Sequence, residues 1–198
     1  MARSEPDLPA IDAFVTSVGG EEIRASSGAV AALAVALAAD LAAQVARASR
    51  EWNERGGALA KADAIRDRAI ELAAEVGRAY QVALATLSLV LAEPTATPSA
   101  GRPDLGGALE RAVEPLLHVG AAASDAAELA ELVARCGSSL VRADAVAATM
   151  LATAAAEMCA HLVDVNLLVT GDDERAWRAR ETVASAAASR EAARTLGR

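Results

Sequence analysis

The stretch SSGAVAALAVALAADLAAQVARAS, residues 26–49, decides the fold of this chain. Alanine has the highest intrinsic helix propensity and serine is a good N-cap, so we expect a helix that starts after residues 26–28 and runs to about Ser49. On a helical wheel its alanines cover one side together with Val35, and its larger residues form a stripe on the other: Val30, Leu33, Leu37, Leu41 and Val45. A helix that is apolar nearly all round is a buried one, which places this segment at the centre of a bundle or on a dimer axis.

The rest of the chain reads as further helices separated by short breaks. Pro9 can open a first helix through Phe14 that ends at Gly19-Gly20. Pro115 is expected to kink or split a later helix, because proline cannot donate a backbone hydrogen bond. Long helices are expected at about 59–91, 105–136, 140–169 and 173–196, with a proline-containing surface loop at 93–104. We predict one all-α domain over residues 1–198, a multi-helix bundle of long alanine-rich helices.

Composition narrows the possible partners. The residues are 54% hydrophobic but only 2% aromatic, and small side chains bury little apolar area each. We therefore expect a homodimer, whose interface would bury further apolar area. A formal net charge of -8 argues against nucleic acid and against an anionic membrane surface. Cys136 and Cys159 are not spaced like metal ligands, and the chain does not have the pattern of a small, secreted, disulfide-bonded domain. We therefore interpret them as reduced thiols in a cytoplasmic protein. No membrane span is expected, because the longest uncharged apolar stretch stops at Asp40.

Asp144 is the first candidate for chemistry. Helical spacing places it on an apolar face with Leu151, Met158 and Leu162. A carboxylate there is either stabilised by the nearby helix N-terminus or held in a pocket for acid/base work. The residues alone leave both interpretations open.

Two further groups of polar residues are candidates for a site. Glu157, His161 and Asp164 share one side of a helix, but the chain has no second Glu-x-x-His, so a solvated stripe or a dimer-interface network is favoured over a metal site. The segment Ser26, Ser27 and Gly28 precedes the buried helix, where free backbone N–H groups can meet an anionic or carbonyl group of a ligand. A plain N-cap explains these residues as well.

The order of these parts resembles the formiminotransferase-cyclodeaminase C-terminal family, which includes single-domain methenyltetrahydrofolate cyclohydrolases. The resemblance covers nearly the whole chain. It rests on four features: Gly28-Ala-Val-Ala-Ala-Leu at the start of an alanine-rich helix, Ala79-Tyr80 in place of an Ala-Phe pair, Pro115, and Asp144 with Ala147-Ala148 at a fixed distance from Asn166-Leu167. The sequence departs from the family in its glycine loop, where Ser26 and Ser27 replace glycines.

The resemblance implies folate one-carbon chemistry on 5-formimino- or 5,10-methenyltetrahydrofolate, as a cyclodeaminase or a cyclohydrolase. It implies Asp144 as the acid/base group and Ser26 to Gly28 as the loop that holds the pterin or carbonyl end. No metal or cofactor is expected beyond the tetrahydrofolate substrate. The alternative is a catalytically degenerate helical homodimer used for ligand binding or assembly, which the altered glycine loop favours.

Overall fold

The computed structural model describes residues 26–92, 104–167 and 173–196, together with five helical positions between 12 and 18. The helix expected from Pro9 to Gly20, including Phe14, otherwise lies outside the described residues. The three ranges hold only helices, which confirms the all-α fold class. Their bounds are α2 Ser27–Ala48, α3 Arg55–Ala92, α4 Leu105–Arg111, α5 Val113–Cys136, the short 3₁₀ helix η1 Ser139–Val141, α6 Arg142–Leu167 and α7 Glu174–Thr195.

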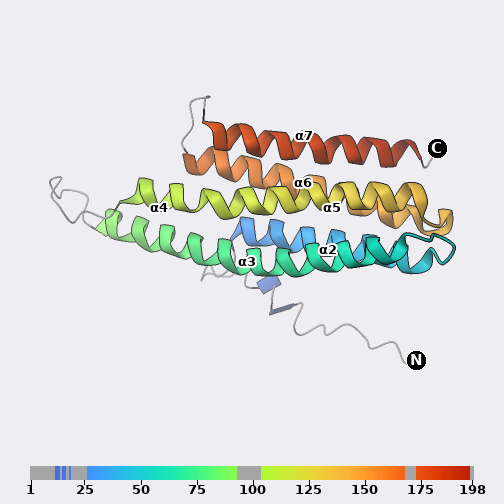
Figure 1. Ribbon diagram of the computed structural model, residues 1–198. Coiled ribbons are helices and arrows are strands. Elements are labelled where there is room, and N and C mark those ends of the chain that lie inside the picture. Colours follow the sequence, from blue (N-terminus) through green and yellow to red (C-terminus); the bar gives the residue numbers. More distant parts are fainter. Residues whose placement is uncertain are drawn as a thin grey trace.

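The long helices form two layers, and successive long helices along the chain run in opposite directions (Figure 1). Helices α3, α5 and α7 make one layer, and α2 and α6 lie behind them in the view. Helix α2 packs against α3, α5 and α6, while α6 packs against α2, α5 and α7. The starts of α2, α5 and α7 therefore lie at the same end of the bundle as the end of α6.

Local sequence explains where the helices begin and break. Three helices start at side-chain N-caps, in which Ser26, Asp104 and Asp173 accept hydrogen bonds from first-turn N–H groups. Pro115 splits the expected 105–136 helix, but the break falls at Ala112, so that proline occupies the first turn of α5. That position tolerates proline because the first-turn N–H groups of a helix have no intrahelical acceptor.

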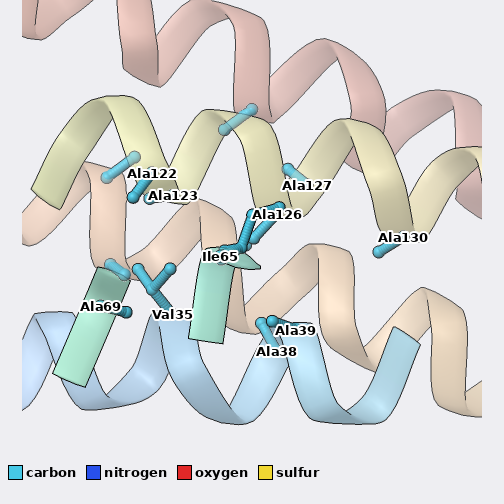
Figure 2. Close-up of a cluster of buried hydrophobic side chains, with 14 of the residues drawn as sticks. Val35, Ala38, Ala39, Ile65, Ala69, Ala122, Ala123, Ala126, Ala127 and Ala130 are labelled. Carbon is cyan, nitrogen blue, oxygen red and sulfur yellow. The ribbon is translucent and has the colours of Figure 1, made fainter. Parts of the chain in front are cut away.

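The core is built mainly from alanine, as Figure 2 shows for the contact between α2, α3 and α5. Val35, Ala38 and Ala39 of α2 point toward a row of alanines on α5, and Ile65 of α3 fills the space between them. A buried methyl group contributes only about 0.8 kcal/mol, against about 1.5–3 kcal/mol for a whole leucine side chain. The gain from small residues is that helices approach closely, so many weak contacts form together.

The side of α2 that faces the core is its alanine side, and this corrects the expectation of burial all round. Val45 is fully buried, but Leu37 is 59% exposed, and Val30, Leu33 and Leu41 are only partly covered. The reason is geometric: the alanine side lets α3, α5 and α6 approach, and the leucine side is left outside.

Helices α2 and α6 are also the two that are long and apolar enough, by length and composition, to cross a membrane. In the bundle, however, 61% and 50% of their most apolar windows is buried against other helices. Their composition is that of core helices with an apolar outer side.

Candidate functional site

A pocket of about 220 Å³ lies at the end of the bundle where α2 begins. We call it the α4 pocket, because the short helix α4 contributes Leu105 and Leu109 to its wall. Five helices meet there: the starts of α2 and α5, the ends of α3 and α6, and α4. The other lining residues are Ser26, Ser27, Gly28, Val76, Tyr80, Ala83, Leu84, Leu87, Ala112, Leu116, Leu162 and Asn166.

The N-terminus of α2 forms one wall of this pocket. Ser26 is buried, and its Oγ accepts a hydrogen bond from the N–H of Ala29 at 3.2 Å. The N–H groups of Ser27 and Gly28 belong to the first helical turn, which offers them no intrahelical acceptor, and no acceptor for them occurs in the parts of the chain that the structure covers. The aligned peptide dipoles add a partial positive charge here, so the wall suits a carbonyl or anionic oxygen.

Gly28 is required by close packing at the base of the pocket. A Cβ on this residue would lie 2.5 Å from Cγ1 of Val76 and 2.6 Å from Cδ2 of Leu116. Both distances are far below van der Waals contact. The first turn of α2 can approach α3 and α5 this closely only because position 28 has no side chain.

Among the described residues, the pocket is lined by groups that form hydrogen bonds but carry no formal charge. Its polar side chains are the Ser26 and Ser27 hydroxyls, the Tyr80 phenol and the Asn166 amide, and the remaining lining residues are apolar. Its volume is below the roughly 300–1,000 Å³ typical of sites for whole drug-sized ligands. The arrangement therefore fits a small, mostly apolar group that carries several hydrogen-bonding atoms.

Arg175, at the start of α7, holds α4 in place over the pocket. Its Nη2 lies 3.0 Å from Oε1 of Glu110 in α4 and 2.8 Å from Oδ2 of Asp173. Hydrogen bonds from Arg175 lower the pKa of the Asp173 carboxyl, and hydrogen bonds to Asp173 and Glu110 raise the pKa of Arg175. Both groups are thus charged across the neutral pH range.

Asp144 does not line the α4 pocket. It lies in the first turn of α6, half-buried, whereas the pocket residues Leu162 and Asn166 lie near the end of that helix. Asp144 and Leu162 are separated by about five helical turns, or roughly 27 Å. Asp144 and the Ser26–Gly28 segment therefore lie at opposite ends of the bundle within one chain.

The polar stripe of α6 interacts with α7. Asp164 lies 3.0 Å from Nη2 of Arg180, Glu157 lies 3.8 Å from Nη1 of Arg190, and His161 is exposed. The described residues contain no group of three or more His, Cys, Asp or Glu side chains that could hold a metal ion.

Sequence reasoning did not identify α4 as part of a site. Its residues fall inside a predicted long helix, although the Asp104 cap and the leucines at 105 and 109 were visible signals. Tyr80 and Asn166 stood within the family-like segments, but nothing in the sequence placed them beside Gly28. That placement requires the end of α6 to return to the start of α2.

Comparisons with known proteins agree with this arrangement. The sequence profile of the formiminotransferase-cyclodeaminase family matches residues 10–185. Among solved structures, formiminotetrahydrofolate cyclodeaminase from Thermotoga maritima superimposes with a TM-score of 0.77 at 20% sequence identity, with 94% of each chain covered. No curated protein sequence matches the chain significantly. The structural likeness shows the shared fold, and the profile match shows the family.

Proposed function

We propose that this chain, which belongs to the formiminotransferase-cyclodeaminase family, binds the ring end of a tetrahydrofolate derivative in the α4 pocket. The proposal rests on residues from separate parts of the chain that meet in one pocket. Gly28, Tyr80 and Asn166 belong to three separate segments in which the sequence resembles the family, and all three line one pocket. Leu116, next to the family-like Pro115, lines it as well.

The pocket supplies what a pterin ring needs. Leu84, Leu109 and Leu116 offer apolar walls to a flat ring. The Asn166 amide can both donate and accept hydrogen bonds, which matches the alternating donors and acceptors of a pterin edge. The free N–H groups of Ser27 and Gly28 suit the ring carbonyl. Because the volume is small, the aminobenzoyl-glutamate tail would extend out of the pocket.

The one-carbon group proposed for this ligand is formimino on N5 or methenyl bridging N5 and N10. In the cyclodeaminase reaction N10 attacks the formimino carbon, the ring closes and ammonia leaves. In the cyclohydrolase reaction water attacks the methenyl carbon and the ring opens to 10-formyltetrahydrofolate. Either reaction needs a proton donor or acceptor within hydrogen-bond reach, and Tyr80 is the titratable side chain among the described lining residues.

Asp144 is the acid that the family resemblance assigns to proton transfer. Its distance from the pocket within one subunit means that ring binding in the pocket does not require it. An Asp144→Asn variant separates the two roles. We expect it to bind the folate as the wild type does, and any loss of turnover in this variant would assign Asp144 to the chemical step.

The second candidate function is ligand binding without turnover. It is supported by the pocket's lack of a charged lining residue in the described parts of the chain and by the serines that replace the family's glycines. The accessible, unpaired Cys136 fits the reducing cytoplasm in which we propose either function takes place.

One experiment tests both candidates. Purified protein is mixed with 5,10-methenyltetrahydrofolate, and loss of the methenyl absorbance and the melting temperature are followed together. An enzyme gives a rate above the buffer control, whereas a binding protein gives only a rise in melting temperature. We expect Asn166→Leu to reduce that rise and the exposed-surface variant Ser88→Ala to leave it unchanged. No rise and no rate for the wild type would refute a folate function.

A further inference from the structure

The base of the α4 pocket is apolar, and Gly28 determines how closely its walls approach. A Cβ at this position would lie 2.5 Å from Cγ1 of Val76 in α3 and 3.8 Å from Cδ1 of Leu162 in α6. Val76 and Leu162 therefore lie against the first turn of α2 from two different helices, both of which pack on α2. These contacts set the depth to which a ligand can enter the pocket.

Polar side chains lie one helical turn beyond this base. Tyr80 follows Val76 by four residues and Asn166 follows Leu162 by four residues, and four residues advance a helix by about 6 Å. Both α3 and α6 run toward this end of the bundle, so Tyr80 and Asn166 lie nearer to the end than the base does. Ser27, at the start of α2, completes this level. We call Ser27, Tyr80 and Asn166 the polar layer of the pocket.

The side chains of Tyr80 and Asn166 are available to a ligand. Both are partly buried and both line the pocket. Neither side chain forms a hydrogen bond to any of the residues that the structure describes. A partly buried polar group without a protein partner is left to bind water or a ligand.

Tyr80 is the side chain of the polar layer that titrates. Tyrosine can act as a general acid, whereas the amide of Asn166 does not titrate. The other described lining residues, which come from α2, α3, α4, α5 and α6, include no Asp, Glu, His, Lys, Arg or Cys. Glu110 of α4 pairs with Arg175 of α7, and Asp144 lies at the opposite end of α6 within one chain. Tyr80 is therefore the described side chain in this pocket that can supply a proton.

We propose that Tyr80 is a catalytic residue, the proton donor to the nitrogen that leaves the one-carbon unit. This role rests on the folate function proposed above and adds a residue to it. Asn166 can bind the pyrimidine edge of the ring. Because α3 and α6 lie on different sides of the start of α2 (Figure 1), the N5 side of the same ring then lies toward Tyr80. N5 carries the one-carbon unit in both candidate substrates.

Both candidate reactions balance with Tyr80 in this role. In the cyclodeaminase reaction the N10–carbon bond forms, the bond from carbon to the formimino nitrogen breaks, and this nitrogen keeps the electron pair and leaves as ammonia after gaining two protons. Tyr80 gives one proton, solvent gives the other, and the phenolate regains its proton from N10. In the cyclohydrolase reaction a water oxygen bonds to the methenyl carbon and the carbon–N5 bond breaks. N5 keeps the electron pair and takes the proton of Tyr80, one proton of the water replaces it, and the second goes to solvent.

The kinetics of Tyr80→Phe in the full chain test this role. Turnover of 5-formimino- or 5,10-methenyltetrahydrofolate is followed at the methenyl absorbance. The variant keeps the aromatic ring and loses the hydroxyl, so we expect kcat to fall about 100-fold or more, with KM and the folate-induced rise in melting temperature unchanged. Ser88→Ala removes an exposed hydroxyl from the same helix and should leave kcat unchanged.

A second measurement uses the fact that the chain has a single tyrosine. Incorporation of 3-fluorotyrosine or 3,5-difluorotyrosine alters Tyr80 alone and makes its phenol progressively more acidic. A proton donor acts only while it is protonated, so the alkaline limb of the kcat profile should move to lower pH in that order. A purely structural role of the ring would not move this limb.

The outcomes separate the role of Tyr80 from the folate function. An unchanged kcat in Tyr80→Phe, or an alkaline limb that fluorination does not move, would overturn the proton-donor role and leave the folate function standing. A wild type that binds folate without turnover would overturn the role as well. A wild type with neither turnover nor a rise in melting temperature would refute the folate function itself, and the role of Tyr80 with it.

Discussion

Gly28 shapes the pocket by lacking a side chain. Gly28→Ala would place a methyl group within 2.6 Å of Val76 and Leu116 side-chain atoms, and we expect a loss of about 1–3 kcal/mol in the free energy of unfolding, as for other overpacked cores. Urea unfolding followed by circular dichroism measures it. The same variant should weaken folate binding, because the neighbours that must move also line the pocket.

The control for this substitution is Gly77→Ala. A Cβ at Gly77 meets nothing within 4 Å, and the residue lies inside α3. Alanine there should stabilise the protein by about 0.5–1 kcal/mol through helix propensity. Equal effects of the two substitutions would contradict the packing role given to Gly28.

The two cysteines should differ sharply in reactivity. Cys136 is exposed, whereas Cys159 is buried, and desolvation raises the pKa of the Cys159 thiol to about 12. A thiol reagent should therefore modify one cysteine quickly and the other only on unfolding, and Cys136→Ser should remove the fast reaction. A fast reaction at both positions, measured by mass spectrometry, would contradict the packing around Cys159.

The Cys159 thiol also predicts a pH dependence of stability. Its folded-state pKa lies above the unfolded value of about 8.5, so the neutral thiol is favoured in the folded state. The stabilising contribution is complete below about pH 8.5 and is lost as the pH rises toward 12. Cys159→Ala should flatten this alkaline decline in urea-unfolding measurements, while Cys136→Ser should not.

At the scale of single elements, α4 depends on Arg175. Arg175→Gln removes the charge that joins α4 to α7, and we expect weaker folate binding with helical content unchanged, since these groups are near the surface. Asp173, which caps α7, orients Arg175 toward α4, and hydrogen bonds from Arg175 lower the pKa of Asp173. The stabilising contribution of the Asp173–Arg175 pair is complete above the ordinary carboxyl range and is lost as the pH falls through the lowered pKa of Asp173. Titration calorimetry with 5-formyltetrahydrofolate measures the folate affinity of the wild type and of Arg175→Gln. Unchanged affinity in Arg175→Gln would show that α4 needs no such anchor.

The helices themselves could be predicted from sequence, because alanine content, serine and aspartate caps and Pro115 act locally. Two features differ from the expectation: the outer side of α2 is exposed, and the break between α4 and α5 falls at Ala112 instead of at Pro115. Apolar residues on every side predict burial when a helix is considered alone, but which side faces the core depends on how closely its neighbours approach. Here the alanine side permits the closer approach, so Leu37 is left exposed.

The candidate site was predictable only in part. Ser26, Ser27 and Gly28 line the pocket at the N-terminus of α2, and their role in ligand binding stays a prediction. Asp144 does not line this pocket, because α6 runs antiparallel to α2 and brings its C-terminal end, with Asn166, to the start of α2. Such pairings between distant segments depend on the topology of the bundle, which local patterns do not specify.

For the whole molecule, the homodimer expected from the alanine-rich composition predicts that stability depends on protein concentration. A dimer that dissociates on unfolding melts at a higher temperature when the protein is more concentrated. We expect this dependence in the wild type. Scanning calorimetry at several concentrations measures it, and a melting temperature independent of concentration in the wild type would contradict a reversible dimer.

The central claim is that the α4 pocket holds the ring of a folate, and Tyr80 allows a direct test. The chain contains a single tyrosine, and it lines this pocket. Protein labelled with 3-fluorotyrosine should therefore give one fluorine NMR signal that reports the pocket alone. On titration with 5-formyltetrahydrofolate we predict a saturable shift of that signal, which Asn166→Leu weakens. A signal that stays unchanged while calorimetry records binding would place the folate elsewhere and contradict the account.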